Sequence, residues 1–169
     1  YTSRAGCNTA ILNQYCEFGV SVHYIDADKF DAGPIIQVLR FPVDLSRESA
    51  HSLERIAQNK LIDLFRLTIE QFQSGMPIRT VANTGGLYLT SNQLDAMKKI
   101  DLAVESPEEI HRKCRAFFFP PYAGAKLDIQ GHEFTLINKD ILEYIHSLIH
   151  ARDRIENPTG PESGAAASV

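Results

Sequence analysis

The fold is decided by residues 19–36, which have the sequence GVSVHYIDADKFDAGPII. Apolar and polar side chains alternate over residues 19–26, and residues 34–43 are rich in β-branched and other apolar types, so both segments are predicted strands. Asp, Lys, Ala and Gly dominate the segment between them, a composition typical of a loop. Two strands joined by a carboxylate-bearing loop indicate an active-site edge, with Asp31 and Gly33 where the second strand begins.

Helical patterns flank these two strands. Residues 8–17 are predicted to form a short helix, and Ser46 is the predicted N-cap of a long helix that ends near Ser74, before Gly75. Helices that alternate with strands predict an α/β fold. One short helix and two strands are too few to begin a parallel sheet, so we expect further sequence before Tyr1.

The second half of the chain is predicted to form a small α+β appendage. Pro, Thr, Asn and Gly are frequent in residues 76–88, which indicates a linker. Ser106, Pro107 and Glu109 then form the sequence signature of a helix capping box. The predicted boundaries are residues 1–82 for the first segment, 83–105 for the linker, 106–151 for the appendage and 152–169 for a flexible tail. Within the appendage, residues 126–129 and 133–137 are a predicted hairpin and residues 140–151 a predicted closing helix.

Composition excludes several classes of function. A net charge of -4, with dispersed Lys and Arg, gives no basic surface for nucleic acid, and no apolar run approaches the ~20 residues of a membrane span. We therefore expect neither a nucleic-acid nor a membrane partner. Cys7, Cys16 and Cys114 are odd in number and widely spaced, so we interpret them as reduced packing residues of a cytoplasmic protein and expect no metal site.

Two side chains near the predicted loop could take part in catalysis. Asp31 follows a loop and precedes a strand, and Gly33 would let a flat ligand approach the backbone closely. The alternative for Asp31 is a turn aspartate that accepts hydrogen bonds from nearby N–H groups. His23 is a single His on an apolar strand, where such a residue more often packs in a core or supports a neighbour than binds a ligand.

A dense aromatic and proline stretch follows the capped helix at residues 115–125. On one interpretation two of its three adjacent Phe side chains pack inward and the third covers the helix end. On the other, Phe or Tyr rings stack on a nucleobase while Arg or Lys holds a pyrophosphate. The second interpretation predicts a sugar-nucleotide ligand, and the residue pattern alone leaves both open.

Two parts of the chain resemble a known family. The strand with His23, the loop and the sequence from Asp31 to Ile36 resemble the formyl-tetrahydrofolate-dependent formyltransferases. Residues 110–125 and 131–134 resemble the C-terminal extension of the sugar N-formyltransferases, and residues 85–102 resemble their linker. The resemblance covers about residues 1–140 and implies the later part of a Rossmann-like formyltransferase domain followed by the appendage.

The resemblance also implies an activity and a set of site residues. A formyl group would pass from formyl-tetrahydrofolate to the amine of a nucleotide-linked 4-amino-4,6-dideoxy sugar, as in lipopolysaccharide O-antigen synthesis. Asp31 would assist proton transfer, and His23 would support it. The implied folate-contacting residues are Ile25, Asp26, Ala27, Asp28, Phe30 and Gly33. The implied nucleotide-binding residues are Arg115, Phe117, Phe119 and Tyr122.

The chain departs from the family in one respect. The enzymes that it resembles complete a catalytic trio with an Asn and a His at positions upstream of Tyr1, and this sequence contains no Asn-x-His. A non-catalytic chain that binds sugar nucleotide, or forms a homodimer through its appendage, is therefore an alternative. Methionyl-tRNA and glycinamide-ribonucleotide formyltransferases share the strand–loop–Asp pattern, but a tRNA acceptor demands a basic surface.

Overall fold

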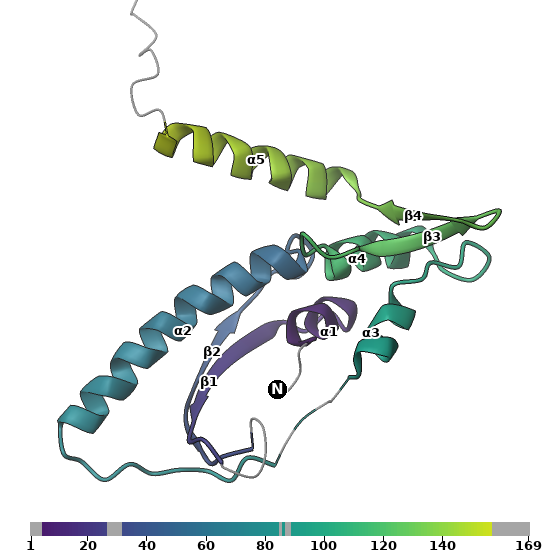
Figure 1. Cartoon of the computed structure of the whole chain (residues 1–169). Helices are drawn as coiled ribbons and strands as arrows, with labels where there is room; N and C mark the ends of the chain where they lie inside the picture. Colours follow the sequence, from purple (N-terminus) through teal and green to yellow (C-terminus); the bar gives the residue numbers. More distant parts are fainter. Residues whose placement is uncertain (1–4, 27–31, 85, 87–88, 157–169) are drawn as a thin grey trace, which may run out of the picture.

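The computed structural model of the chain describes residues 5–26, 32–84, 86 and 89–156, with only the backbone of the last four residues (Figure 1). Helices and strands are mixed, as an α/β assignment predicts. In chain order the described elements are α1 (Gly6–Leu12), β1 (Glu17–His23), β2 (Ile35–Pro42), α2 (Ala50–Gln73), α3 (Ser91–Met97), α4 (Pro107–Phe117), β3 (Ala125–Ile129), β4 (His132–Leu136) and α5 (Lys139–Glu156). Within this described part, no helix is long and apolar enough to cross a membrane.

The two strands of the deciding stretch form an antiparallel hairpin, β1 and β2, beside the long helix α2 (Figure 1). Phe18 is paired with Phe41 and Val22 with Gln37, and the register shifts between Val22 and His23. Gln37 faces α2, because its Oε1 accepts a hydrogen bond from Thr68 Oγ1 at 3.4 Å. Side chains alternate between the faces of a strand, so Phe18 and Val22 also face α2 and His23 lies on the opposite face.

The long helix begins three residues later than a cap at Ser46 would require. Ser49 is the N-cap: its Oγ accepts a hydrogen bond from Ser52 N at 3.1 Å, and Ser52 Oγ accepts one from Ser49 N at 2.9 Å. Ser46 instead donates its hydroxyl to Asp44 Oδ1, 2.5 Å away, within a turn. The prediction of Ser46 as the cap is therefore wrong, whereas Gly75, at φ +69°, follows the helix as predicted.

The predicted linker contains a helix that the sequence analysis did not predict. α3 begins after Thr90, whose Oγ1 accepts a hydrogen bond from Gln93 N at 3.2 Å while Gln93 Oε1 accepts one from Thr90 N at 2.9 Å. The capping box at the start of α4 is confirmed. Ser106 Oγ accepts from Glu109 N at 3.2 Å, and Glu109 Oε2 accepts from Ser106 N at 2.8 Å.

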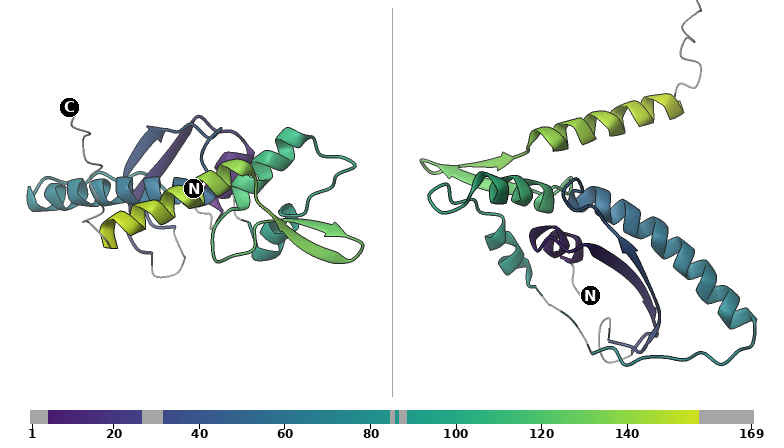
Figure 2. Two further views of the ribbon diagram at one scale, coloured as in Figure 1. Left: turned by 90° about the horizontal axis from the view of Figure 1, so that it is seen from above. Right: turned by 180° about the vertical axis from the view of Figure 1, so that it is seen from behind.

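The hairpin of the appendage is confirmed as β3 and β4, and the closing helix α5 is longer than predicted at both ends. α5 is held near its start, where Ile141 is buried and the Tyr144 hydroxyl lies 2.8 Å from His51 Nδ1 on α2. Beyond that contact the helix extends away from the rest of the chain (Figure 2). The predicted tail beyond residue 156 lies outside the described residues.

Two buried clusters meet at α4. The first joins α1, the start of α2 and α4, and its buried members are Cys7, Ala10, Ile11, Leu45, Ala50, Leu53, Ala116 and Phe117. The second joins α4 to β3 and α5 through Ile100, Cys114, Phe118, Ala125 and Ile141. α4 therefore packs against elements on both sides of the predicted linker. Cys7 and Cys114 are buried as predicted, whereas Cys16 is exposed and is not a packing residue.

Candidate functional site

The loop expected to contact folate joins β1 to β2, and much of it lies outside the described residues. Asp31, Ala27, Asp28 and Phe30 fall in this undescribed part. At its start, Ile25 is 96% exposed, although it is a large apolar side chain. Its side chain is therefore accessible from solvent.

Gly33 is required by the chain's own backbone. A Cβ built on Gly33 would lie 1.7 Å from the Tyr24 carbonyl oxygen, so no other residue fits. The two ends of the loop are joined there, because Tyr24 N donates to Pro34 O at 3.0 Å. The loop is also held from outside, since Ile35 and Val81 exchange two backbone hydrogen bonds of 2.8 Å. These contacts fix the position from which residues 27–31 emerge.

His23 is half-buried at the loop end of β1, on the face of the hairpin away from α2. The next residue, Tyr24, points the other way and packs against Phe72 of α2, with ring centroids 6.4 Å apart. His23 and the described ends of the loop therefore lie at one end of the hairpin. The catalytic roles of His23 and Asp31 remain predictions.

The aromatic stretch at the C-terminal end of α4 divides between the two cores and a cavity. Phe117 is buried in the first core and Phe118 in the second, whereas Phe119 is half-buried and Tyr122 is 71% exposed. Phe119 and Tyr122 lie together, with ring centroids 6.2 Å apart. Three of the four predicted nucleotide-binding residues, Phe117, Phe119 and Tyr122, line one cavity of about 810 Å³. We call this cavity the aromatic cavity.

Side chains from four other elements complete the aromatic cavity. Phe18 of β1 adds a further apolar wall, and the polar lining comes from Asn8, Glu54, Ser91, Asn92, Asp95 and Lys98. Among the described residues that line it, carboxylates thus outnumber cations by two to one. Sequence reasoning found the aromatic side of this cavity but missed the polar side, because α1, α2 and α3 are brought together only by long-range packing.

The carboxylates of the aromatic cavity have defined partners. Asp95 lies 3.3 Å from Lys126 Nζ and 3.4 Å from Lys98 Nζ, and the hydrogen bond from Lys126 is the main reason why its pKa is lowered. Glu54 Oε2 accepts a hydrogen bond from Cys7 Sγ at 3.4 Å. Burial, together with Glu54, raises the pKa of the Cys7 thiol to about 12, so Cys7 is a neutral donor at physiological pH.

Arg115 does not line the aromatic cavity. Its side chain is only 7% exposed, and its Nη1 donates to Leu45 O at 2.5 Å and to Glu48 O at 3.4 Å. Burial lowers the pKa of the guanidinium, which nevertheless stays charged at any physiological pH. The structure therefore separates Arg115 from the rings with which the sequence grouped it. A single ligand whose base stacks on Phe119 and Tyr122 would therefore not place its pyrophosphate against Arg115.

The fold matches that of solved formyltransferases. A 4-N formyltransferase from Francisella tularensis aligns with a TM-score of 0.69 over 80% of this chain and 56% of its own, at 22% identity. An N-formyltransferase from Helicobacter canadensis, solved with folinic acid and dTDP-3-aminofucose, aligns with a TM-score of 0.61 over 76% of this chain and 46% of its own, at 26% identity.

A third match is HypX from Aquifex aeolicus in complex with tetrahydrofolic acid, with a TM-score of 0.66 at 18% identity over 80% of this chain and 23% of its own. No protein-family model and no curated protein matches the sequence. The chain spans about half the length of the two N-formyltransferases. The predicted fold is confirmed: the chain folds like part of a formyltransferase, and the proteins that it resembles include sugar N-formyltransferases.

Proposed function

We propose that this chain forms the acceptor-binding part of an N-formyltransferase, which moves a formyl group from formyl-tetrahydrofolate to the amine of a nucleotide-linked 4-amino-4,6-dideoxy sugar. The observation that carries the proposal is the aromatic cavity, because it combines rings with carboxylates in a chain that folds like these enzymes. Its volume of about 810 Å³ lies within the range of small-molecule sites.

The lining of the aromatic cavity suits the two ends of such an acceptor. Phe119 and Tyr122 lie together in the lining, and Tyr122 is largely exposed, so a nucleobase could stack on them. At the other end an amino sugar carries a positive ammonium, which Glu54 would attract, whereas Asp95 is already paired with Lys126 and Lys98. Phe117 supports the wall from the core and contacts a ligand with little of its surface.

The loop between β1 and β2 would supply the folate side of the reaction. Formyl transfer needs a group that removes the ammonium proton and donors that stabilise the tetrahedral oxyanion. We propose Asp31 for the first role, with His23 as a positioning residue, and the backbone of residues 25–30 as one wall of the folate pocket. The Asn and His of the family's trio would have to come from outside this sequence, so the chain alone is proposed to bind rather than to catalyse.

The binding half of the proposal can be tested by calorimetric titration of this chain with thymidine 5′-diphosphate. Phe119→Ala should weaken binding about two- to tenfold, because an aromatic contact contributes about 0.5–1.5 kcal/mol beyond its buried area. Phe65→Ala is the matched control, since Phe65 is an exposed ring on α2 that does not line the aromatic cavity. Equal affinities of the wild type and Phe119→Ala would refute the stacking role.

A second candidate function is homodimer formation through the appendage. Several of its apolar side chains are exposed: Ile129 and Phe134 on the hairpin and Leu142 and Ile149 on α5 are each about half exposed. Exposed apolar groups of this size mark interaction surfaces. Sedimentation equilibrium of the chain, with Phe134→Ser and Leu142→Ser variants, would distinguish a dimer that depends on these side chains from a monomer.

A further inference from the structure

A second cavity lies at the opposite end of the β1–β2 hairpin from the loop with Asp31. It has a volume of about 650 Å³ and is formed where the first half of α4 meets the turn before β1 and the segment after β2. We call it the arginine cavity. Its lining includes Tyr15, Val43, Glu108, His111, Arg112 and Arg115, and it shares no lining residue with the aromatic cavity.

The guanidinium of Arg115 is buried without a carboxylate in direct contact. The acceptors of its hydrogen bonds are the neutral carbonyls of Leu45 and Glu48, and its Nε is buried with no hydrogen-bond partner. No carboxylate of the described residues lies within ion-pair distance of Arg115, and Asp140 and Asp44 act on it only from farther away. Burying a charge that has no ion-pair contact costs several kcal/mol, so an anion bound directly in the adjoining space would stabilise this arrangement.

Arg112 brings a second guanidinium to the same cavity. It is one helical turn before Arg115 on α4, half-buried, and within the described part of the chain it has no hydrogen-bond or ion-pair partner. His111 also lines the cavity, and its Nε2 lies 3.5 Å from Asp140 Oδ2. Glu108 is the carboxylate that opposes these groups within the lining. Two guanidiniums against one carboxylate leave the lining positive at neutral pH.

The donors and walls of the arginine cavity define the class of ligand. Guanidinium groups match the oxygens of a phosphate with paired hydrogen bonds, better than a point charge does. Val43, Tyr15 and Pro107 supply apolar walls, which an inorganic ion would leave unused. The N-terminus of α4 adds little to the attraction for a phosphate, because the carboxylates of Glu108 and Glu109 in its first turn offset the positive end of the helix dipole.

We propose that the arginine cavity binds a small phosphate monoester through Arg112 and Arg115, at a site separate from the aromatic cavity. The phosphate lies against the two guanidiniums, and the organic part of the ester lies against Val43 and Tyr15. Because Leu45 and Glu48 belong to the segment between β2 and α2, a ligand here also ties α4 to that segment.

The proposal is tested by calorimetric titration of the full chain with inorganic phosphate, thymidine 5′-monophosphate and uncharged thymidine. We expect the monophosphate to bind more tightly than inorganic phosphate, and Arg112→Gln to weaken its binding about tenfold or more, as loss of a charge-assisted hydrogen bond should. Glu108→Gln should strengthen binding severalfold, which a merely structural role of this helix would not produce. Arg66→Gln, on the exposed side of α2, is the matched control.

The outcomes separate this site from the acceptor site. If Phe119→Ala weakens binding of the monophosphate as much as Arg112→Gln does, the ligand occupies the aromatic cavity and the proposal is overturned. If inorganic phosphate binds as tightly as the monophosphate, the organic part makes no contact and the proposed ligand class is wrong. Absence of binding at millimolar monophosphate, or equal affinity of wild type and Arg112→Gln, also overturns it. Thermal unfolding of Arg112→Gln without ligand checks that the variant is folded.

Discussion

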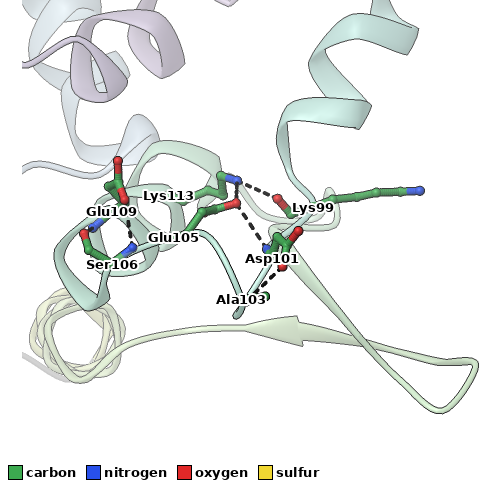
Figure 3. Close-up of polar contacts among 7 residues, drawn as sticks. All are labelled: Lys99, Asp101, Ala103, Glu105, Ser106, Glu109 and Lys113. Atoms are coloured by element: carbon green, nitrogen blue, oxygen red, sulfur yellow. Dashed lines mark hydrogen bonds and ion pairs between the residues drawn. The ribbon is translucent and has the colours of Figure 1, made fainter.

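Replacing Lys113 by Met should destabilise the segment that connects α3 to α4. Lys113 projects from α4, and its Nζ donates to Lys99 O at 2.5 Å and to Glu105 Oε1 at 2.6 Å (Figure 3). Glu105 Oε1 also accepts a hydrogen bond from Asp101 N at 3.2 Å. One ammonium thus holds residues 99–105 against α4, and this segment directly follows Lys98, which lines the aromatic cavity.

The size of the expected loss of stability follows from how deeply Lys113 and Glu105 are buried. The Lys113 and Glu105 side chains are only 16% and 19% exposed, and Glu105 Oε2 is already buried without a hydrogen-bond partner. Removing the ammonium leaves the carboxylate without its charge partner, which costs about 3–5 kcal/mol for a fully buried pair. Water can reach this pair in part, so we discount that figure and expect the free energy of unfolding to fall by about 2 kcal/mol.

The assay is a double-mutant cycle measured by urea unfolding. Lys113→Met, Glu105→Gln and the double variant should show a coupling energy of about 1 kcal/mol or more between the two side chains. Lys139→Met is the control, because Lys139 forms an ion pair of 3.6 Å with Glu143 on the exposed surface of α5. Such surface pairs contribute little. A Lys113→Met cost no larger than that of Lys139→Met, or zero coupling, would refute the reasoning.

Two further predictions concern a helix cap and the proposed catalytic residue. Ser106→Ala should lower the free energy of unfolding by about 1 kcal/mol in urea titrations, since it removes the α4 cap, whereas Ser46→Ala should cost distinctly less because Ser46 does not cap α2. In a complete enzyme that contains this chain, Asp31→Asn should lower the turnover rate by about 10²–10⁴, and a change within about threefold would contradict a role in proton transfer.

The elements that could be predicted from sequence are those whose signals are local. The α4 capping box needs only Ser106, Pro107 and Glu109, and the β3–β4 hairpin needs only alternation around a Gln-Gly turn. The same chemistry at Thr90 and Gln93 was overlooked, because α3 has seven residues and too few apolar positions to show a helical period. The cap at Ser49 could not be distinguished from Ser46, since its reciprocal partner is Ser52 rather than the usual Glu or Gln.

The candidate site was harder to predict, because its parts meet over long distances in the chain. Asn8 Nδ2 donates to Ala116 O at 2.6 Å across 108 positions, and Arg115 reaches Leu45 O across 70. Those contacts decide which side of α4 faces which cavity. A linear stretch shows that Arg115 and Phe117 are two residues apart. In the structure α4 continues through Phe117, and residues two apart on a helix point in different directions.

That separation changes how an acceptor could bind. A sugar nucleotide carries a base, two phosphates and a sugar, and the sequence alone suggested that one stretch could hold both base and phosphates. In the structure, Lys98 is the one cation among the described residues that line the aromatic cavity, and Asp95 already pairs with it. Charge therefore disfavours a diphosphate beside Glu54 and Asp95. On the proposed function, the base and the amine are the parts of the acceptor that the cavity suits, and the diphosphate would point out into solvent. Most of the affinity should then come from stacking on Phe119 and Tyr122, and added salt should weaken binding only slightly.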